Sequence, residues 1–206
     1  MNIHSANVCS AKKSAVACRP EIVAEEIRFA TARSELGTIL VARSPAGVCA
    51  ILVGDEAKAL KRDLAAEFGD ARLVRDDRGL NADLDRILTF IENPAKGLDL
   101  PLDIQGTPFQ RRVWTALLGV RVGYKITYAA LASRIGEPRA VRAVANACAA
   151  NAIALAIPCH RVVRSDGALA GYRWGMERKQ FMIEKEAGIE HACAAGQRSN
   201  PALIHG

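Results

Sequence analysis

The chain lacks any long apolar run of the kind that crosses a membrane. The nearest stretch, residues 147–157, is broken by Asn151, and a membrane helix needs about 20 apolar residues in succession. A secretory signal is not expected either, because Lys12 and Lys13 are followed by only four apolar residues, Ala15–Cys18. With 206 residues, 50% of them apolar, the chain has room for one domain or two small lobes. We therefore expect a globular, monomeric, cytoplasmic protein without a membrane partner.

The cysteines lack the repeated short spacing of a zinc site or a disulfide framework. We expect reduced thiols, no cofactor and no metal. The N-terminal segment has two readings. One is a set of three metal ligands, His4, Cys9 and Cys18, and the other is an unstructured terminus. The six cysteines are Cys9, Cys18, Cys49, Cys148, Cys159 and Cys193.

Negative charge is scarce in the second half of the chain. Residues 27–106 carry 11 Lys and Arg against 13 Asp and Glu, whereas residues 107–190 carry 13 against 6. Such an excess of positive charge suits a polyanion, with nucleic acid as the first candidate, although scattered arginines also simply aid solubility.

Residues 27–100 have the pattern of an α+β lobe. Three strand-like segments, 27–32, 37–43 and 47–53, are separated by turn residues and predict an antiparallel meander. Asp55 is expected to cap a helix over 56–68, and a second helical pattern runs over 80–91. Residues 1–26 and 191–206 show no sustained pattern, and we expect both ends to be frayed.

A second, helical lobe is predicted over residues 101–190. Thr107-Pro108-Phe109-Gln110 is a capping box that begins a helix ending near Leu118. Two short helices within 127–150, separated by Gly136-Glu137-Pro138, fit a helix-turn-helix, and the second runs over 139–149. An internal helical hairpin packed in the core is the alternative. A last helix over 176–187 is expected to end at Gly188.

Cys159 is followed directly by His160, and this pair is a candidate for nucleophilic chemistry. Thiolate is the reactive form of cysteine, and neighbouring His or Arg groups lower its pKa. In an extended segment adjacent side chains point to opposite faces, so we expect His160 to act through a water and a carboxylate to orient it. The alternative is an inert core cysteine, which is common. Glu186, expected in the final turn of the last helix, would oppose the helix dipole there and need a cationic or hydrogen-bonding partner.

Pro158-Cys159-His160-Arg161, the helix-turn-helix pattern and Gly171-Tyr172-Arg173-Trp174-Gly175 together resemble the O6-alkylguanine-DNA alkyltransferases, the methylated-DNA–protein-cysteine methyltransferases. The resemblance is strongest over 105–188 and is closest to the Ada-like members. It implies a ribonuclease H-like α/β first lobe and a helical second lobe that carries the active cysteine. The implied partner is double-stranded DNA containing alkylated guanine, from which the alkyl group passes irreversibly to Cys159; O4-alkylthymine would be repaired more weakly.

The resemblance also implies roles for individual residues. Cys159 matches the alkyl acceptor, His160 its base, Glu186 the carboxylate that orients the histidine, and Asn151 the residue that holds the turn before the active segment. Tyr128 matches the tyrosine that crowds the target phosphate and donates to the departing purine. The implied DNA-binding residues are Arg142, Tyr128, Ala143 and Asn146, with Arg142 filling the place of the flipped base. The implied base-pocket residues are Tyr172, Val162, Arg173 and Cys148.

Some positions depart from the family pattern. Ala152 stands where many relatives have proline, and Arg173 is bulkier than the serine of some relatives, so larger adducts are expected to be excluded. No four-cysteine zinc module precedes the first lobe, so we expect repair without transcriptional control. Two other readings are a helix-turn-helix regulator with an incidental cysteine, and a cysteine hydrolase, which would lack an obvious oxyanion loop.

Overall fold

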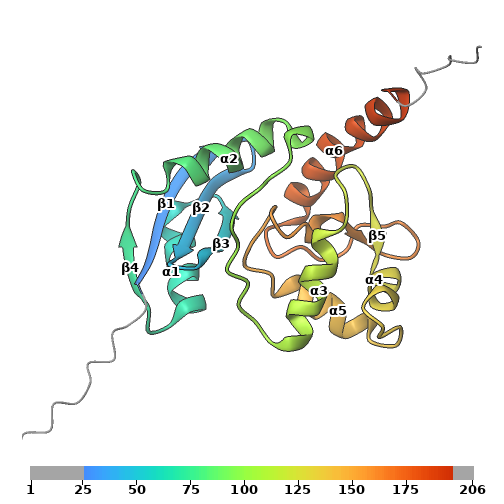
Figure 1. Ribbon diagram of the computed structural model, residues 1–206, viewed down its shortest axis with the longest axis horizontal. Helices are drawn as coiled ribbons and strands as arrows, with labels where there is room; N and C mark the ends of the chain where they lie inside the picture. The colour runs from blue at the N-terminus through green and yellow to red at the C-terminus, as the bar shows by residue number, and fades with distance from the viewer. Residues whose placement is uncertain (1–25, 197–206) are drawn as a thin grey trace, which may run out of the picture.

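The computed structural model describes residues 26–196 and shows two lobes side by side (Figure 1). A mixed sheet with two helices forms the first lobe, and the second is mainly helical, so the predicted α+β class is confirmed. The N-terminal metal-ligand alternative, His4, Cys9 and Cys18, and the end of the expected tail, 197–206, lie outside the described residues. None of the helices between residues 26 and 196 combines the length and the apolar composition needed to cross a bilayer.

The first lobe is built on a sheet of strand order β3-β2-β1-β4. β1 (Glu26–Ser34), β2 (Gly37–Ser44) and β3 (Gly47–Gly54) form the predicted antiparallel meander. β4 (Arg72–Arg75) pairs parallel to β1 and was missed, because two apolar residues between two arginines carry little strand signal. β2 and β3 are buried along nearly their whole length, which makes them the centre of the core.

Two helices cover this sheet: α1 (Ala57–Phe68) packs on β2 and β3, and α2 (Asn81–Glu92) packs on β1. The prediction that Asp55 caps α1 was wrong. Glu56 is the N-cap residue, without a side-chain hydrogen bond, and Asp55 instead pairs with Arg178 of the second lobe. An ion pair between lobes thus replaces the local contact that a sequence pattern suggests.

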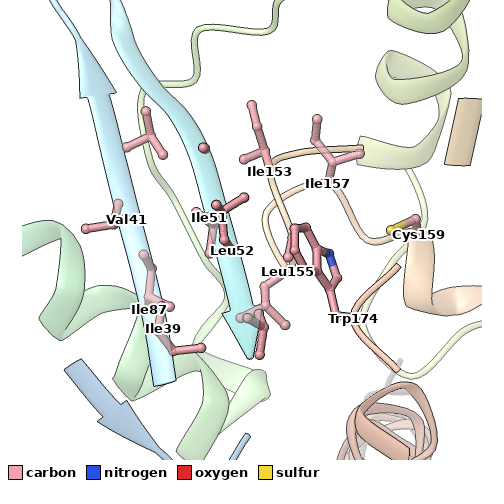
Figure 2. Packing of buried hydrophobic residues seen from close by; sticks show 14 of the residues in the cluster. Ile39, Val41, Ile51, Leu52, Ile87, Ile153, Leu155, Ile157, Cys159 and Trp174 are labelled. Carbon is pink, nitrogen blue, oxygen red and sulfur yellow. The ribbon is translucent and has the colours of Figure 1, made fainter. Parts of the chain in front are cut away.

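The second lobe covers the exposed edge of β3. After the turn η1 (Pro94–Lys96), the chain crosses over and forms a bridge between Leu102 and Val48. Farther along, Ile153 forms a second bridge with Ile51, closed by hydrogen bonds from Ile51 N to Ala152 O and from Ala154 N to Ile51 O. Figure 2 shows Ile153, Leu155 and Ile157 facing the strand residues Ile51 and Leu52. Backbone groups of the edge strand β3 thereby gain hydrogen-bond partners from the second lobe. The two lobes share one hydrophobic core.

Three helices build the body of the second lobe. α3 (Pro108–Leu118) begins with the predicted capping box, since Thr107 and Gln110 each accept from the other's backbone N–H. α4 (Tyr128–Arg134) and α5 (Val141–Ala149) are the two predicted helices, and α5 begins two residues later than expected. A parallel pair of two-residue strands, β5 (Ile126–Thr127) and β6 (Val162–Val163), joins the start of α4 to the segment after Cys159.

The last helix, α6, runs over Met176–Gly196, so the prediction that it ends at Gly188 was wrong, as was the frayed end over 191–196. One glycine inside a helix costs only about 1 kcal/mol, and the alanine-rich residues that follow favour helix strongly enough to continue it. Glu186 therefore lies in the interior of α6 rather than in its final turn. Any effect of the helix dipole on Glu186 is correspondingly small.

Candidate active site

Cys159 begins a short 3-10 turn, η2 (Cys159–Arg161), and the extended segment that we predicted there was wrong. The turn forms because Cys159 N donates to Ile157 O at 2.8 Å and Arg161 N donates to Pro158 O at 3.0 Å. Side chains at successive positions of such a turn still diverge, so Cys159 and His160 do not face each other directly. Both are buried, at 4% and 0% exposure.

Asn151 ties the end of α5 to the cysteine. Its Nδ2 donates to Ile157 O at 3.0 Å and to Cys159 Sγ at 3.2 Å, while its Oδ1 accepts from Ile153 N at 2.9 Å. One fully buried amide thus fixes the turn and also places an N–H donor on the sulfur. A donor in this position favours the thiolate over the thiol.

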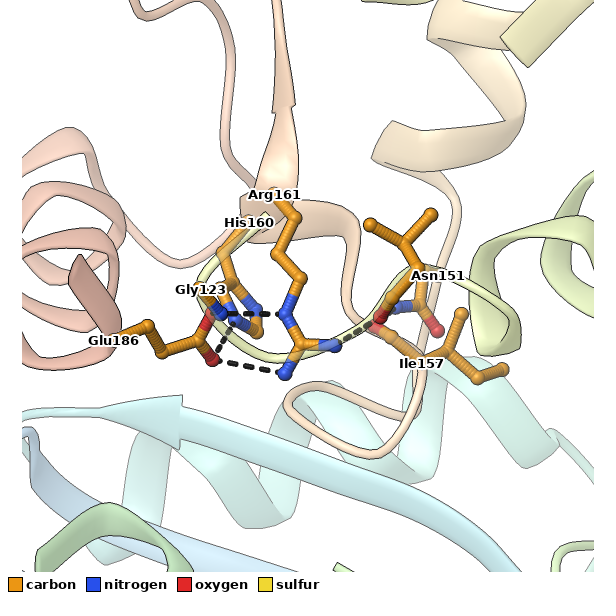
Figure 3. A network of polar contacts seen from close by, with 7 residues as sticks. Gly123, Asn151, Ile157, His160, Arg161 and Glu186 are labelled. Atoms are coloured by element: carbon orange, nitrogen blue, oxygen red, sulfur yellow. Dashed lines mark hydrogen bonds and ion pairs between the residues drawn. The ribbon is translucent and has the colours of Figure 1, made fainter. Parts of the chain in front are cut away.

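His160 and Arg161 both contact Glu186 of α6 (Figure 3). His160 Nε2 lies 2.9 Å from Glu186 Oε1, and Arg161 makes a bidentate pair through Nε and Nη2 at 2.8 and 2.9 Å. Gly123 N also donates to Glu186 Oε2, at 3.4 Å. All three side chains are buried, and such a buried carboxylate is tolerated because four donors surround it.

The protonation states follow from burial and from these contacts. Burial by itself raises the pKa of Glu186. The hydrogen bonds from His160 and Arg161 outweigh this effect and lower the pKa to about 2. An ionised carboxylate only accepts, so Nε2 of His160 carries the proton and Nδ1 holds the lone pair. Burial also lowers the pKa of His160, which keeps the ring neutral. Nδ1 is buried and has no hydrogen-bond partner among the described residues, which leaves it available as a base.

The sulfur itself is held as a thiol by its surroundings. Burial raises the pKa of Cys159, and the Asn151 hydrogen bond and the charge of Lys179 act in the opposite direction. A thiol with a raised pKa needs a base before it can act as a nucleophile. The neutral His160 beside it has the protonation state that such a base requires.

Tyr128, the first residue of α4, lies at the other side of the site. Its hydroxyl donates to Ala170 O at 3.3 Å, and the same carbonyl accepts from Lys179 Nζ at 2.7 Å. Burial raises the pKa of Tyr128, and the proximity of the Cys148 and Cys159 thiols adds to the rise, which brings the pKa to about 12. The hydroxyl is therefore protonated at neutral pH and can donate.

Lys179 and Arg161 are site residues to which we assigned no role from the sequence. Lys179 is fully buried on α6, and burial lowers its pKa. The signal that identifies it is spacing, because Lys179, Met182 and Glu186 recur at intervals of three and four and form the buried stripe of α6. Lys179 and Glu186 are the charged residues of this buried stripe, and they lie on the side of α6 that packs against the site.

The predicted base-pocket residues surround the same point. Val162 is fully buried in β6, and Cys148 is buried on α5, where desolvation raises its pKa to about 12. Tyr172 and Arg173 lie in the loop between β6 and α6; Tyr172 is half-buried, and the side chain of Arg173 is 28% exposed. Burial raises the pKa of Tyr172, and proximity to Cys159 adds to the rise. The predicted base-pocket residues thus come from three segments, α5, β6 and the loop before α6.

Three of the four predicted DNA-binding residues lie on one face of α5, and the fourth, Tyr128, begins α4. Arg142, Ala143 and Asn146 are exposed, whereas Val144, Ala147 and Cys148 point into the lobe. The helix is held from behind by α3, where Trp114 Nε1 donates to Ala147 O at 2.8 Å. Among residues 26–196, no group of three or more His, Cys, Asp or Glu side chains has the arrangement of a metal site.

Comparison with known proteins agrees with this geometry. The sequence model described as "6-O-methylguanine DNA methyltransferase, DNA binding domain" matches residues 108–188. The methylated-DNA–protein-cysteine methyltransferase of Mycobacterium bovis is 39% identical over 111 residues, which cover 54% of this chain and 67% of the relative. The chain belongs to the methylated-DNA–protein-cysteine methyltransferase family.

Solved structures of this methyltransferase family extend the match to both lobes. The crystal structure of Mycobacterium tuberculosis OGT in complex with DNA superposes with a TM-score of 0.65 and 30% identity, covering 79% of this chain and 93% of that one. The Ada protein of Escherichia coli, a bifunctional transcriptional activator and DNA repair enzyme, is 47% identical over 164 residues. That alignment covers 80% of this chain but 46% of Ada, so the chain spans about half the length of this relative.

Proposed function

We propose that this protein repairs O6-alkylguanine in double-stranded DNA by moving the alkyl group to its own Cys159, with O4-alkylthymine as a poorer substrate. One observation carries the proposal. Asn151 Nδ2 lies 3.2 Å from Cys159 Sγ, and the neighbouring His160 lies 2.9 Å from an ionised Glu186, within a lobe that also holds a helix-turn-helix. The complex of Mycobacterium tuberculosis OGT with DNA supports the nature of the partner.

The proposed reaction is a direct displacement. His160 Nδ1 takes the thiol proton through a water, and the thiolate sulfur forms a bond to the alkyl carbon as the bond from that carbon to guanine O6 breaks. The electron pair of the broken bond stays with guanine, which takes a proton at N3 from the Tyr128 hydroxyl. Tyr128 recovers its proton from the imidazolium, so that overall the thiol proton ends on guanine. The product at Cys159 is a thioether.

The proposed reaction ends after one turnover. A thioether has no good leaving group, and the nearby thiol of Cys148 is buried with a pKa raised to about 12. It is therefore protonated at neutral pH and does not reset the site.

The exposed face of α5 is the proposed DNA contact. Small residues such as Ala143 allow close approach to the minor groove, and Arg142 would occupy the place that the flipped base leaves. Flipping costs a few kcal/mol of stacking, part of which an inserted side chain offsets. We place the DNA-binding and acceptor domain at 101–190 and a ribonuclease H-like lobe at 27–100, acting as a monomer.

A helix-turn-helix regulator with an incidental cysteine is not favoured. Such a protein has no need for a buried His160–Glu186–Arg161 cluster beside a thiol, because base contacts and phosphate contacts come from the exposed face of the helix. A cytoplasmic location and the absence of a membrane partner remain expectations from the sequence.

Stoichiometry tests the proposal. A duplex oligonucleotide with one O6-methylguanine, mixed with increasing amounts of protein, is expected to lose one methyl group for each protein chain and then stop. Repeated turnover by one chain, or no loss of methyl with excess protein, would contradict it. Cys159→Ala is expected to bind the duplex with unchanged salt dependence and to transfer nothing.

A further inference from the structure

An ion pair between the two lobes holds one wall of the active site. Arg173 Nη2 lies 2.9 Å from Glu67 Oε2, with the two side chains 28% and 32% exposed. Glu67 is in the last turn of α1, where a carboxylate opposes the helix dipole and gains from a cation nearby. Glu67 belongs to the first lobe, from which none of the predicted site residues comes.

Arg173 in turn lies over the indole ring of Trp174, with its guanidinium 4.8 Å from the ring centroid. Trp174 is 6% exposed, and its Nε1 has no hydrogen-bond partner among the described residues. Figure 2 shows the ring between Leu155 and Cys159, with the nitrogen on the side of the cysteine. Packing therefore positions this ring, and the Arg173 guanidinium is part of that packing.

Beyond Arg173 and Trp174 lies a cleft of about 500 Å³ between the lobes, lined by both residues and by Asp55, Ala59 and Asp63 of the first lobe. An apolar cavity of about 150 Å³ already accommodates benzene. The volume of this cleft is therefore ample for an aromatic ring once the side chains of Arg173 and Trp174 move aside.

The backbone of this loop is fixed independently of Glu67. Arg178 donates to Trp174 O at 2.8 Å and to Leu36 O at 2.7 Å, and it also pairs with Asp55. With the main chain held in this way, loss of the Glu67 contact frees chiefly the Arg173 side chain and the ring beneath it.

We infer that Glu67 is a positioning residue that limits the size of the alkyl group accepted at Cys159. The inference rests on the proposed alkyl transfer. Through its ion pair with Arg173, Glu67 keeps the Trp174 ring beside the sulfur, which leaves space for a methyl group and disfavours a benzyl group. The first lobe thereby sets substrate selectivity without touching the substrate.

The test compares wild type and Glu67→Gln on two duplexes of one sequence, carrying O6-methylguanine or O6-benzylguanine, under single-turnover conditions. Glu67→Gln is expected to raise the ratio of benzyl to methyl transfer rates about fivefold, the most that an ion pair this exposed is worth. Because both substrates react at the same sulfur, a change in its pKa cancels in this ratio. In an Arg173→Ala background, Glu67→Gln is expected to change the ratio no further.

Two matched variants separate this role from general loosening. Glu56→Gln removes an exposed charge at the other end of α1 and is expected to leave the ratio unchanged. Asp55→Asn removes an ion pair between the first lobe and Arg178 of α6, and it is also expected to leave the ratio unchanged. An equal rise of the ratio with Asp55→Asn, or no rise with Glu67→Gln while methyl transfer proceeds, overturns the role of Glu67 and leaves the proposed function in place. Failure of the wild type to transfer methyl overturns the proposed function as well.

Discussion

Asn151 Nδ2 donates a hydrogen bond to Cys159 Sγ at 3.2 Å while its Oδ1 accepts from Ile153 N at 2.9 Å. The same Nδ2 also donates to Ile157 O at 3.0 Å, so the nitrogen supports both the turn and the sulfur. Aspartate keeps the acceptor for Ile153 N and loses both of these donor contacts.

Asn151→Asp is expected to slow methyl transfer at neutral pH by about tenfold or more, since a hydrogen bond to a charged group is worth about 1.5–3 kcal/mol. The loss of the donor raises the pKa of Cys159 further, so the pH–rate profile is expected to move to higher pH. Single-turnover rates measured across pH check this. An unchanged profile together with an unchanged urea midpoint would show that the amide does not act on the sulfur.

Glu186 makes stability depend on acid pH. Its pKa is lowered to about 2 in the folded protein, below the ordinary value near 4.5, so its contribution is complete above pH 4.5 and is lost as the pH falls toward 2. The shift corresponds to roughly 3 kcal/mol. Urea unfolding at several pH values is expected to show this loss in the wild type and a flatter curve in Glu186→Gln. Parallel curves for the two proteins would assign the acid sensitivity to other groups.

Glu186→Gln is also expected to lower stability at pH 7 by about 3–5 kcal/mol, because the variant leaves Arg161 buried without its anion. The free energy of unfolding in urea at pH 7 measures this cost. A variant as stable as the wild type would mean that Arg161 finds another partner or leaves the interior.

Arg142→Ala is expected to slow repair of duplex DNA by about tenfold or more and to change the reaction with the free alkylated base little. The reason is that the exposed guanidinium of α5 is needed only where a base must be flipped out of a stack. Arg86→Ala, which removes an equal charge from the exposed side of α2, is the matched control and is expected to leave both rates unchanged. Equal slowing of both substrates by Arg142→Ala would refute the stacking role.

Tyr128→Phe is expected to slow transfer from duplex and from free base alike, by about a hundredfold or more, as for loss of a general acid. The carbonyl of Ala170 keeps its bond to Lys179 at 2.7 Å, so the loop stays in place. Thermal unfolding of the variant near the wild-type temperature, with reduced rates, is the expected combination. Full activity in Tyr128→Phe would mean that guanine leaves without a proton from this hydroxyl.

The sequence predicted the elements of the fold whose signals are local. The capping box at Thr107 and the meander over 27–53 depend on neighbouring residues and were confirmed. The predictions of an extended segment at Cys159 and of Asp55 as the cap of α1 were wrong. The first depends on the buried side chain of Asn151, and the second on Arg178, 123 residues farther along the chain than Asp55. The end of α6 was wrong because one glycine does not outweigh the helix-forming residues around it.

For the site, the motifs around Cys159 named candidate residues but did not show what holds them in place. The pairing of Glu186 with Arg161 as well as His160, and the burial of Lys179, depend on how α6 packs against η2. The contact between Glu67 and Arg173 joins residues 106 positions apart, and no local pattern predicts it. The catalytic roles of these residues remain predictions.

The mass of the protein after reaction tests the central claim most directly. After incubation with a duplex containing O6-methylguanine, intact-mass spectrometry is expected to show an increase of about 14 Da, as for replacement of a thiol hydrogen by a methyl group. Peptide mapping is expected to place the methyl group on Cys159, in the wild type and in Cys148→Ser alike. An unchanged mass, or a methyl group on any other side chain, would contradict the account.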